Sequence, residues 1–99
     1  MAALTIVYWR DIPAQVIVKK GRTSAKRELA LRFTEAIDMA AMRTGAAETD
    51  AYLAEWRRGD PLDVSDDLEK EADAAVARID AEYGKDRLVA LVKNGGRDG

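Results

Sequence analysis

The sequence predicts an α+β fold, with an N-terminal two-stranded β-hairpin packed against three to four helices. Three observations support this prediction: residues 4–20 alternate apolar and polar side chains on either side of a proline, residues 25–83 carry apolar residues at helical spacing, and glycines follow the periodic segments. A chain of 99 residues provides one hydrophobic core. We therefore expect a single domain over residues 1–94 and a disordered tail over residues 95–99.

The predicted hairpin has its turn around Pro13. Residues 4–10 alternate apolar and polar side chains, and the pattern resumes over residues 15–20. Proline lacks an N–H and interrupts strand pairing, so it belongs in the connection. Beside it, Arg10 and Asp11 are expected to form a local ion pair, which is worth about 0–1 kcal/mol when exposed.

Apolar side chains on both faces of this hairpin predict a partner surface. We expect Leu4, Ile6 and Ile17 on one face, covered by a single helical layer. The other face and the open strand edge would then remain for strand addition by another copy or a larger protein. On the first helix, Leu31 and Met42 lie off the core stripe and are either isolated surface residues or part of the same contact. The predicted partner surface is Val7, Trp9, Val16, Val18, Leu31 and Met42.

The first helix is expected over residues 25–44. Thr23 or Ser24 provides the N-cap, and Gly45 follows the last turn. Its apolar residues recur at helical spacing and form the side that faces the core. These core residues are Leu29, Phe33, Ala36, Ile37 and Ala40.

Further helices are expected towards the C-terminus. A short helix covers residues 51–58, a loop continues to Val64, and a longer amphipathic helix covers residues 66–83 with Ser65 as its N-cap. Residues 86–94 fit either a helix or a strand. The spacing of their apolar residues and the Asn-Gly-Gly that follows favour a helix.

Positive charge is concentrated near the N-terminus. Residues 3–27 carry a net charge of +5, so the remaining residues carry −7 to give the formal net charge of −2. Clustered cations, hydroxyl groups and the free N–H groups of a helix start suit a phosphate or carboxylate. A solvated basic face that protects the hairpin edge from aggregation explains the same charges. The candidate anion-binding residues are Lys19, Lys20, Arg22, Thr23, Ser24, Lys26 and Arg27.

Two absences from the composition limit the chemistry. The chain has no His and no Cys, which excludes zinc and haem sites with the usual ligands, iron–sulfur clusters, and Ser-His-Asp or Cys-His catalysis. The acidic stretch over residues 60–82 lacks the spacing of an EF-hand. We therefore expect no catalytic residues, no metal and no cofactor, and a protein that is not an enzyme.

The expected partners are proteins. A sequence pI near 5.1 argues against nucleic acid. The chain shows no apolar run of transmembrane length and no signal peptide, and it lacks Cys, which together indicate a cytoplasmic location and no membrane partner. We expect a protein partner or self-association into a homo-oligomer.

A family resemblance is carried by three stretches: IVYWRDIPAQVIVKKGR, LRFTEAIDMAAMRTGA and AYLAEWRRGDPL. Together they resemble the small bacterial domain family called "virulence factor", over about residues 4–93, with YWRDIPAQV as the specific block. The resemblance implies a domain that occurs alone or appended to larger proteins with scaffold-like or HEAT-type repeats. It supplies no catalytic residues, and the family name describes a phenotype rather than a chemistry.

Three functions follow from the residues and the resemblance together. The leading prediction is a non-catalytic protein-interaction or accessory domain. The alternative is a small anion- or phosphate-binding module that uses the basic segment from Lys19 to Arg27. The third, implied by the resemblance alone, is an accessory subunit of a folate- or corrinoid-linked one-carbon enzyme.

Overall fold

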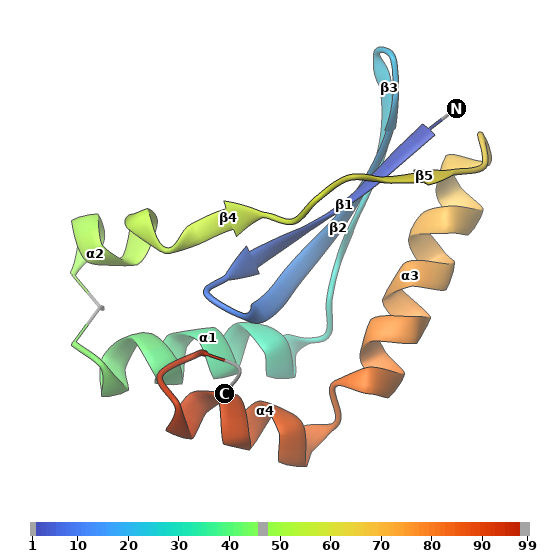
Figure 1. Cartoon of the computed structure of the whole chain (residues 1–99). Coiled ribbons are helices and arrows are strands. Elements are labelled where there is room, and N and C mark those ends of the chain that lie inside the picture. Colours follow the sequence, from blue (N-terminus) through green and yellow to red (C-terminus); the bar gives the residue numbers. More distant parts are fainter. Residues whose placement is uncertain (1, 46–47, 98–99) are drawn as a thin grey trace.

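The computed structural model describes residues 2–45 and 48–97 and has an α+β fold, with a five-stranded antiparallel sheet and four helices (Figure 1). In chain order the elements are β1 (Ala2–Trp9), β2 (Ile12–Lys20), β3 (Thr23–Glu28), α1 (Leu31–Arg43), α2 (Thr49–Ala54), β4 (Trp56–Arg58), β5 (Leu62–Val64), α3 (Leu68–Glu82) and α4 (Lys85–Lys93). The predicted fold class is confirmed, but the prediction of only two strands is wrong.

Both edges of the β1–β2 hairpin are filled by the chain itself. The strand order is β3-β2-β1, and β4 and β5 both pair with the other edge of β1. Between these two short strands the N–H of Gly59 donates to the carbonyl of Ile6 at 2.8 Å, so pairing along β1 is nearly continuous. The open hairpin edge that we expected for strand addition is therefore occupied, and the sheet ends at β3 instead.

The first helix begins later than predicted because residues 23–28 form a strand. A two-residue turn, Gly21-Arg22, reverses the chain after β2, and Gly21 has the positive φ of 59° that glycine adopts without strain. Thr23 and Ser24 therefore pair with β2 and do not cap a helix. The helix α1 starts after Ala30 and ends before Gly45, as expected at that end.

The C-terminal half also departs from the prediction in places. The expected helix over residues 51–58 is split into α2 and β4, and part of the expected loop forms β5. The N-cap of α3 is Asp67, whose carboxylate accepts from the N–H of Lys70 at 3.2 Å, so the prediction of Ser65 is wrong. The helix prediction for residues 86–94 is confirmed by α4.

Strand register sets which side chains enter the core. Leu4 pairs with Val18 and Ile6 pairs with Val16, so these four share one face of the sheet. We had placed the two valines on the opposite face from Leu4 and Ile6, and that prediction is wrong. The reason is a register shift between Val7 and Tyr8 that leaves one residue of β2 unpaired and offsets the alternation of the two strands.

The helices cover the sheet in two groups. The buried residues Ala72, Ala75 and Ile79 of α3 belong to the same core as Leu4 and Val18. Figure 1 shows α1 and α4 side by side, below the end of the hairpin where β1 turns into β2. One face of the upper part of the sheet is thereby left without a helix over it, among the residues that the structure describes.

The C-terminal turn is part of the fold. Gly95 and Gly96 are buried, and the N–H of Asp11 donates to the carbonyl of Gly96 at 2.8 Å. The predicted disordered tail therefore does not begin at residue 95, and residues 98 and 99 lie outside the described residues. Over the described ranges, no helix has the length and apolar character needed to cross a membrane.

Candidate functional site

The accessible face of the sheet is lined by side chains from neighbouring strands. Strand pairing places Thr5, Ile17 and Lys26 side by side across β1, β2 and β3, and places Lys19 beside Ser24. Thr5 and Ile17 are only partly buried, whereas the β2 residues that alternate with them are fully buried under α3. This face of the paired strands is therefore exposed to solvent.

A shallow cavity of about 440 Å³ lies on this face, close to the β2–β3 turn. Ile17 supplies an apolar surface and Ser24 supplies a hydroxyl group, while the other long side chains are cations. We call the following set of lining residues the basic sheet face: Ile17, Lys19, Gly21, Arg22, Ser24, Lys26 and Arg58.

The four cations of the basic sheet face are not paired with a carboxylate of the described residues, although the register places Asp63 and Glu28 on the same face of the sheet. Lys19, Arg22, Lys26 and Arg58 form no ion pair or hydrogen bond through their side chains with any residue that the structure describes. Among the residues that the structure describes, no acidic side chain lines the cavity. Four like charges held on one surface create a positive potential that favours an anionic ligand.

Basic residues on the opposite face are neutralised by α3 and the loop before it. Lys20 donates to Asp66 at 2.8 Å, and Arg27 bonds both Glu69 and, at 2.9 Å, Asp73. The hydrogen bond from Lys20, with its positive charge, holds the pKa of Asp66 below its usual range. These cations therefore fix α3 against the sheet, and the free positive charge of this segment lies on the basic sheet face.

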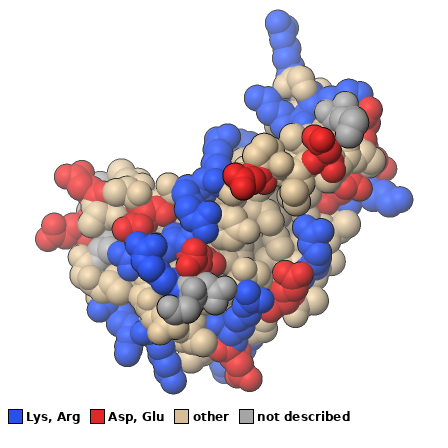
Figure 2. Space-filling view, viewed as in Figure 1, with Lys and Arg blue, Asp and Glu red and all other residues tan. Residues whose placement is uncertain are grey.

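The distribution of charge is visible on the molecular surface. Figure 2 shows Lys and Arg side chains at the projecting end of β2 and β3, with acidic side chains close to that end and both signs of charge over the rest of this view. The chain as a whole carries a net charge of −2, so this is a local positive region on an acidic protein.

The structure brings together four of the seven predicted anion-binding residues. Those in the cavity are Lys19, Arg22, Ser24 and Lys26. Those on or towards the opposite face are Lys20, Thr23 and Arg27. The predicted contribution of helix N–H groups is wrong, because this segment is a β-hairpin. Binding of an anion stays a prediction.

Arg58 is a member of the site that the sequence analysis did not identify. It lies on β4, where it pairs with Val7 of β1 and so shares a face with Ile17. We had assigned this segment to a helix, which gave no reason to place Arg58 near β2. The available signal was the Arg57-Arg58 pair followed by a glycine. Successive strand residues point to opposite faces, so in a strand one of the two arginines would lie on the accessible face.

The predicted partner surface is largely wrong. Trp9, Val16 and Val18 are fully buried in the core, and no partner can reach them in the folded chain. Val7 is partly buried on the accessible face. The helical residues of the prediction, Leu31 and Met42, are 70% and 73% exposed, so a contact role for them stays a prediction.

The turn between β1 and β2 has a structural role. Arg10 occupies the left-handed region with φ 54° and lies over the Trp9 ring, 4.8 Å from its centroid. Its guanidinium donates to the carbonyl of Gly95 at 2.6 Å and to the hydroxyl of Thr44 at 3.3 Å, and it pairs with Glu55 at 3.5 Å. Arg10 thus connects the hairpin turn to α1, α2 and the C-terminal turn.

The predicted ion pair between Arg10 and Asp11 is wrong. The carboxylate of Asp11 instead accepts from Arg57 of β4 at 3.0 Å, and Arg57 also donates to the carbonyl of Arg10 at 2.9 Å. Both charged residues of the turn therefore bond to elements that are distant in sequence, and these contacts attach the turn to the rest of the fold.

Comparison with known families gives a match over nearly the whole chain. The family described as "Virulence factor" matches residues 7–92. The chain belongs to the virulence factor family. The part of this virulence factor domain that the family matches includes the whole basic sheet face and the Trp9–Asp11 turn. Comparison with curated proteins and with solved structures gives no match.

Proposed function

We propose that this virulence factor domain is a non-catalytic interaction domain that binds an acidic segment of a partner protein through the basic sheet face. The observation that supports the proposal is a set of four cations around one cavity, none of which forms an ion pair with a described residue. Lys20 and Arg27 belong to the same basic segment but already form ion pairs with Asp66 and Asp73. The contrast gives the free cations a binding role rather than a stabilising one.

The net charge of the chain favours a short acidic segment over nucleic acid. The four free cations lie on a chain of net charge −2, so the remaining surface repels a long polyanion. Nucleic-acid binding draws its affinity from many phosphate contacts along an extended basic surface. A segment with a few Asp or Glu residues needs only the local region, and its affinity falls as salt screens the charges.

The edge strand β3 suits an extended partner. It pairs with β2 on one side only, so no described strand pairs with the backbone N–H and C=O groups of its other edge, where the carbonyl of Lys26 accepts from the Arg27 side chain at 2.9 Å. A partner strand added there would satisfy these groups, and acidic side chains on one face of that strand would lie beside Lys26. Backbone pairing would supply affinity and the cations would select for negative charge.

Removing free cations is expected to weaken binding of a short Asp/Glu-rich peptide. In titration calorimetry at low salt, the Lys19→Gln, Lys26→Gln variant should bind about tenfold or more weakly than the natural chain. The matched control is Lys70→Gln, Arg78→Gln, which removes the same charge from exposed positions of α3 and should bind with nearly unchanged affinity.

Three results would contradict the proposal. The first is that the natural chain binds the acidic peptide no better than a neutral peptide of the same length. The second is that both double variants lose affinity equally. The third is that the cavity binds pyrophosphate more tightly than the peptide. The last result would instead support a small phosphate-binding module, which the Ser24 hydroxyl beside Lys19 also suits.

A further inference from the structure

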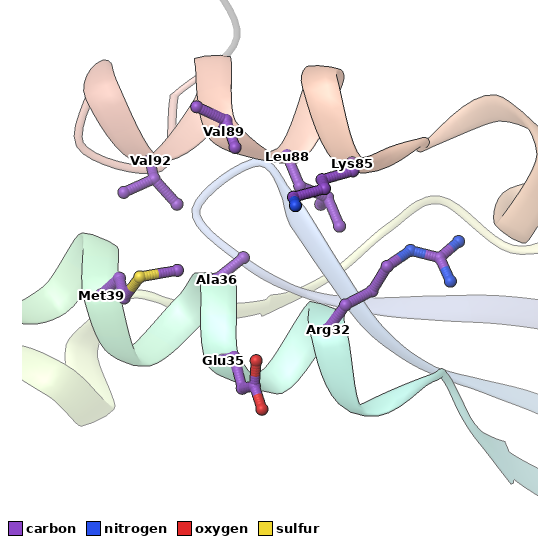
Figure 3. A pocket seen from close by; sticks show the side chains of 8 residues that line it. All are labelled: Arg32, Glu35, Ala36, Met39, Lys85, Leu88, Val89 and Val92. Atoms are coloured by element: carbon purple, nitrogen blue, oxygen red, sulfur yellow. The ribbon is translucent and has the colours of Figure 1, made fainter.

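A second surface, formed by α1 and α4, has a different chemistry. The two helices lie side by side and enclose an open groove of about 200 Å³ (Figure 3). Its walls are mostly apolar, and charged side chains lie at one end and along one rim. The lining residues are Arg32, Glu35, Ala36, Met39, Lys85, Leu88, Val89 and Val92.

The groove is suited to the side chains of another protein. Leu88 and Ala36 are buried and form its floor, whereas Met39 and Val89 remain 51% and 40% exposed on its walls. Its volume lies below the roughly 300–1,000 Å³ of small-molecule sites. Adaptable Met side chains beside a short apolar groove are typical of surfaces that receive one face of an amphipathic helix.

The two ends of the groove differ in charge. Figure 3 shows Arg32 and Lys85 at one end and Met39 and Val92 at the other, so α1 and α4 run in the same direction. Both helices therefore begin near the cationic end, where their macrodipoles are also positive. Acidic residues also lie near this end: Arg32 is hydrogen-bonded to Asp80 at 2.7 Å, Asp86 is in the first turn of α4, and Glu35 lines the groove. Lys85 is the cation of the lining that has no ion pair with any described residue.

We infer that the α1–α4 groove binds an amphipathic helix of a partner protein, antiparallel to α1 and α4, with acidic side chains in its last turn. Its apolar stripe would cover Met39, Val89 and Val92. Its C-terminal carboxylates would lie beside Lys85, and the negative end of its dipole would meet the positive ends of α1 and α4. This site shares no residue with the basic sheet face and does not depend on the proposed function.

A second copy of this chain is a poorer occupant of the groove. A two-fold axis can place two such helix pairs against each other either parallel or antiparallel. In the parallel arrangement the ends with Arg32 and Lys85 of both copies meet. In the antiparallel arrangement the last turns of one copy face the first turns of the other. The last turns of α1 and α4 carry Arg43 and Lys93. These cations would then lie beside Arg32 and Lys85, and the like charges would repel.

A display selection tests this inference. A library of helical peptides with a fixed apolar stripe and random residues in the terminal turns is selected on the full chain. Selected peptides are expected to be enriched in Asp or Glu in the last turn, and to lose about tenfold or more in affinity for the Met39→Lys, Val89→Lys variant. The control Leu53→Lys, Leu62→Lys changes exposed apolar residues outside the groove and should leave affinity nearly unchanged.

A charge reversal tests the orientation. For Lys85→Glu, selection should favour Lys or Arg in the last turn of the peptide, while circular dichroism confirms an unchanged fold. Three results would overturn the inference: no peptide that depends on the groove, enrichment that does not change with Lys85→Glu, or a dimer of the natural chain in sedimentation that Met39→Lys, Val89→Lys converts to monomer. The last result would assign the groove to a second copy.

Discussion

Replacing Trp9 with alanine is expected to lower the free energy of unfolding by about 3–5 kcal/mol. The Trp9 side chain is fully buried, and its indole N–H donates to the carbonyl of Tyr52 at 2.9 Å. The two rings stack with their centroids 5.8 Å apart, and Arg10 covers the indole from another side. The change therefore removes a contact shared by β1, α2 and the hairpin turn, and leaves the Tyr52 carbonyl with only the longer hydrogen bond from the N–H of Glu55, at 3.4 Å.

Urea denaturation followed by circular dichroism measures this loss. The matched control is Trp56→Ala, which removes the same side chain from a partly exposed position on β4 that pairs with Trp9, and should cost clearly less. Domains of this size have a total stability of roughly 5–15 kcal/mol, so the Trp9 variant loses a large part of it. Equal losses for the two variants, or a Trp9→Ala loss under about 1 kcal/mol, would contradict the central position of Trp9.

Replacing Gly95 with alanine is expected to cost about 2–4 kcal/mol, because two unfavourable terms add. The backbone of Gly95 has φ 68°, which strains any residue with a Cβ. An added Cβ would also lie 2.5 Å from the Cγ2 of Thr44. Thr44 cannot easily move, because its hydroxyl donates to the carbonyl of Ala40 at 2.9 Å.

The change Gly45→Ala separates the two terms. Gly45 has φ 74°, but an added Cβ would meet no atom within 4 Å, so only backbone strain of about 1–2 kcal/mol is expected. Thermal and urea unfolding of both variants give the comparison. If Gly95→Ala costs no more than Gly45→Ala, the C-terminal turn is not packed against α1 as the structure has it.

The fold class and most helices could be predicted from periodicity, but β3 could not. The segment TSAKRE contains residues with high helix propensity, and it directly precedes a true helix. In the structure it pairs with β2, and Ala25 is buried while its neighbours are exposed. Pairing with an existing strand outweighed local propensity, which is a tertiary effect that a sequence window does not contain.

The short strands β4 and β5 were missed for a different reason. Each has three residues, too few to show a period of two. They form because β1 offers an unpaired edge, and Gly59 between them lets the chain pass closely over Tyr8, where an added Cβ would be 3.0 Å from the ring. Without them the hairpin appeared to have an open edge, and this led to the incorrect partner surface.

The candidate site was predicted in part. The basic segment identified the region, but sequence alone could not show which cations are free, because this depends on where α3 and the loop before it place their acidic residues. Lys19 and Lys20 are neighbours in sequence, yet only Lys20 meets Asp66. The alternation of a strand separates the free cations from the paired ones, whereas the predicted helix would have mixed them.

The most direct test of the proposed function is to map the binding site of a short Asp/Glu-rich peptide by NMR on the ¹⁵N-labelled chain. At low salt, the proposal predicts amide shift changes concentrated at Ile17, Lys19, Arg22, Lys26 and Arg58, with weaker changes as salt is added. Asp66 and Asp73, which hold Lys20 and Arg27, should change little. Shift changes centred on the α1–α4 groove, changes spread evenly over all exposed cations, or no changes at all would contradict the proposal.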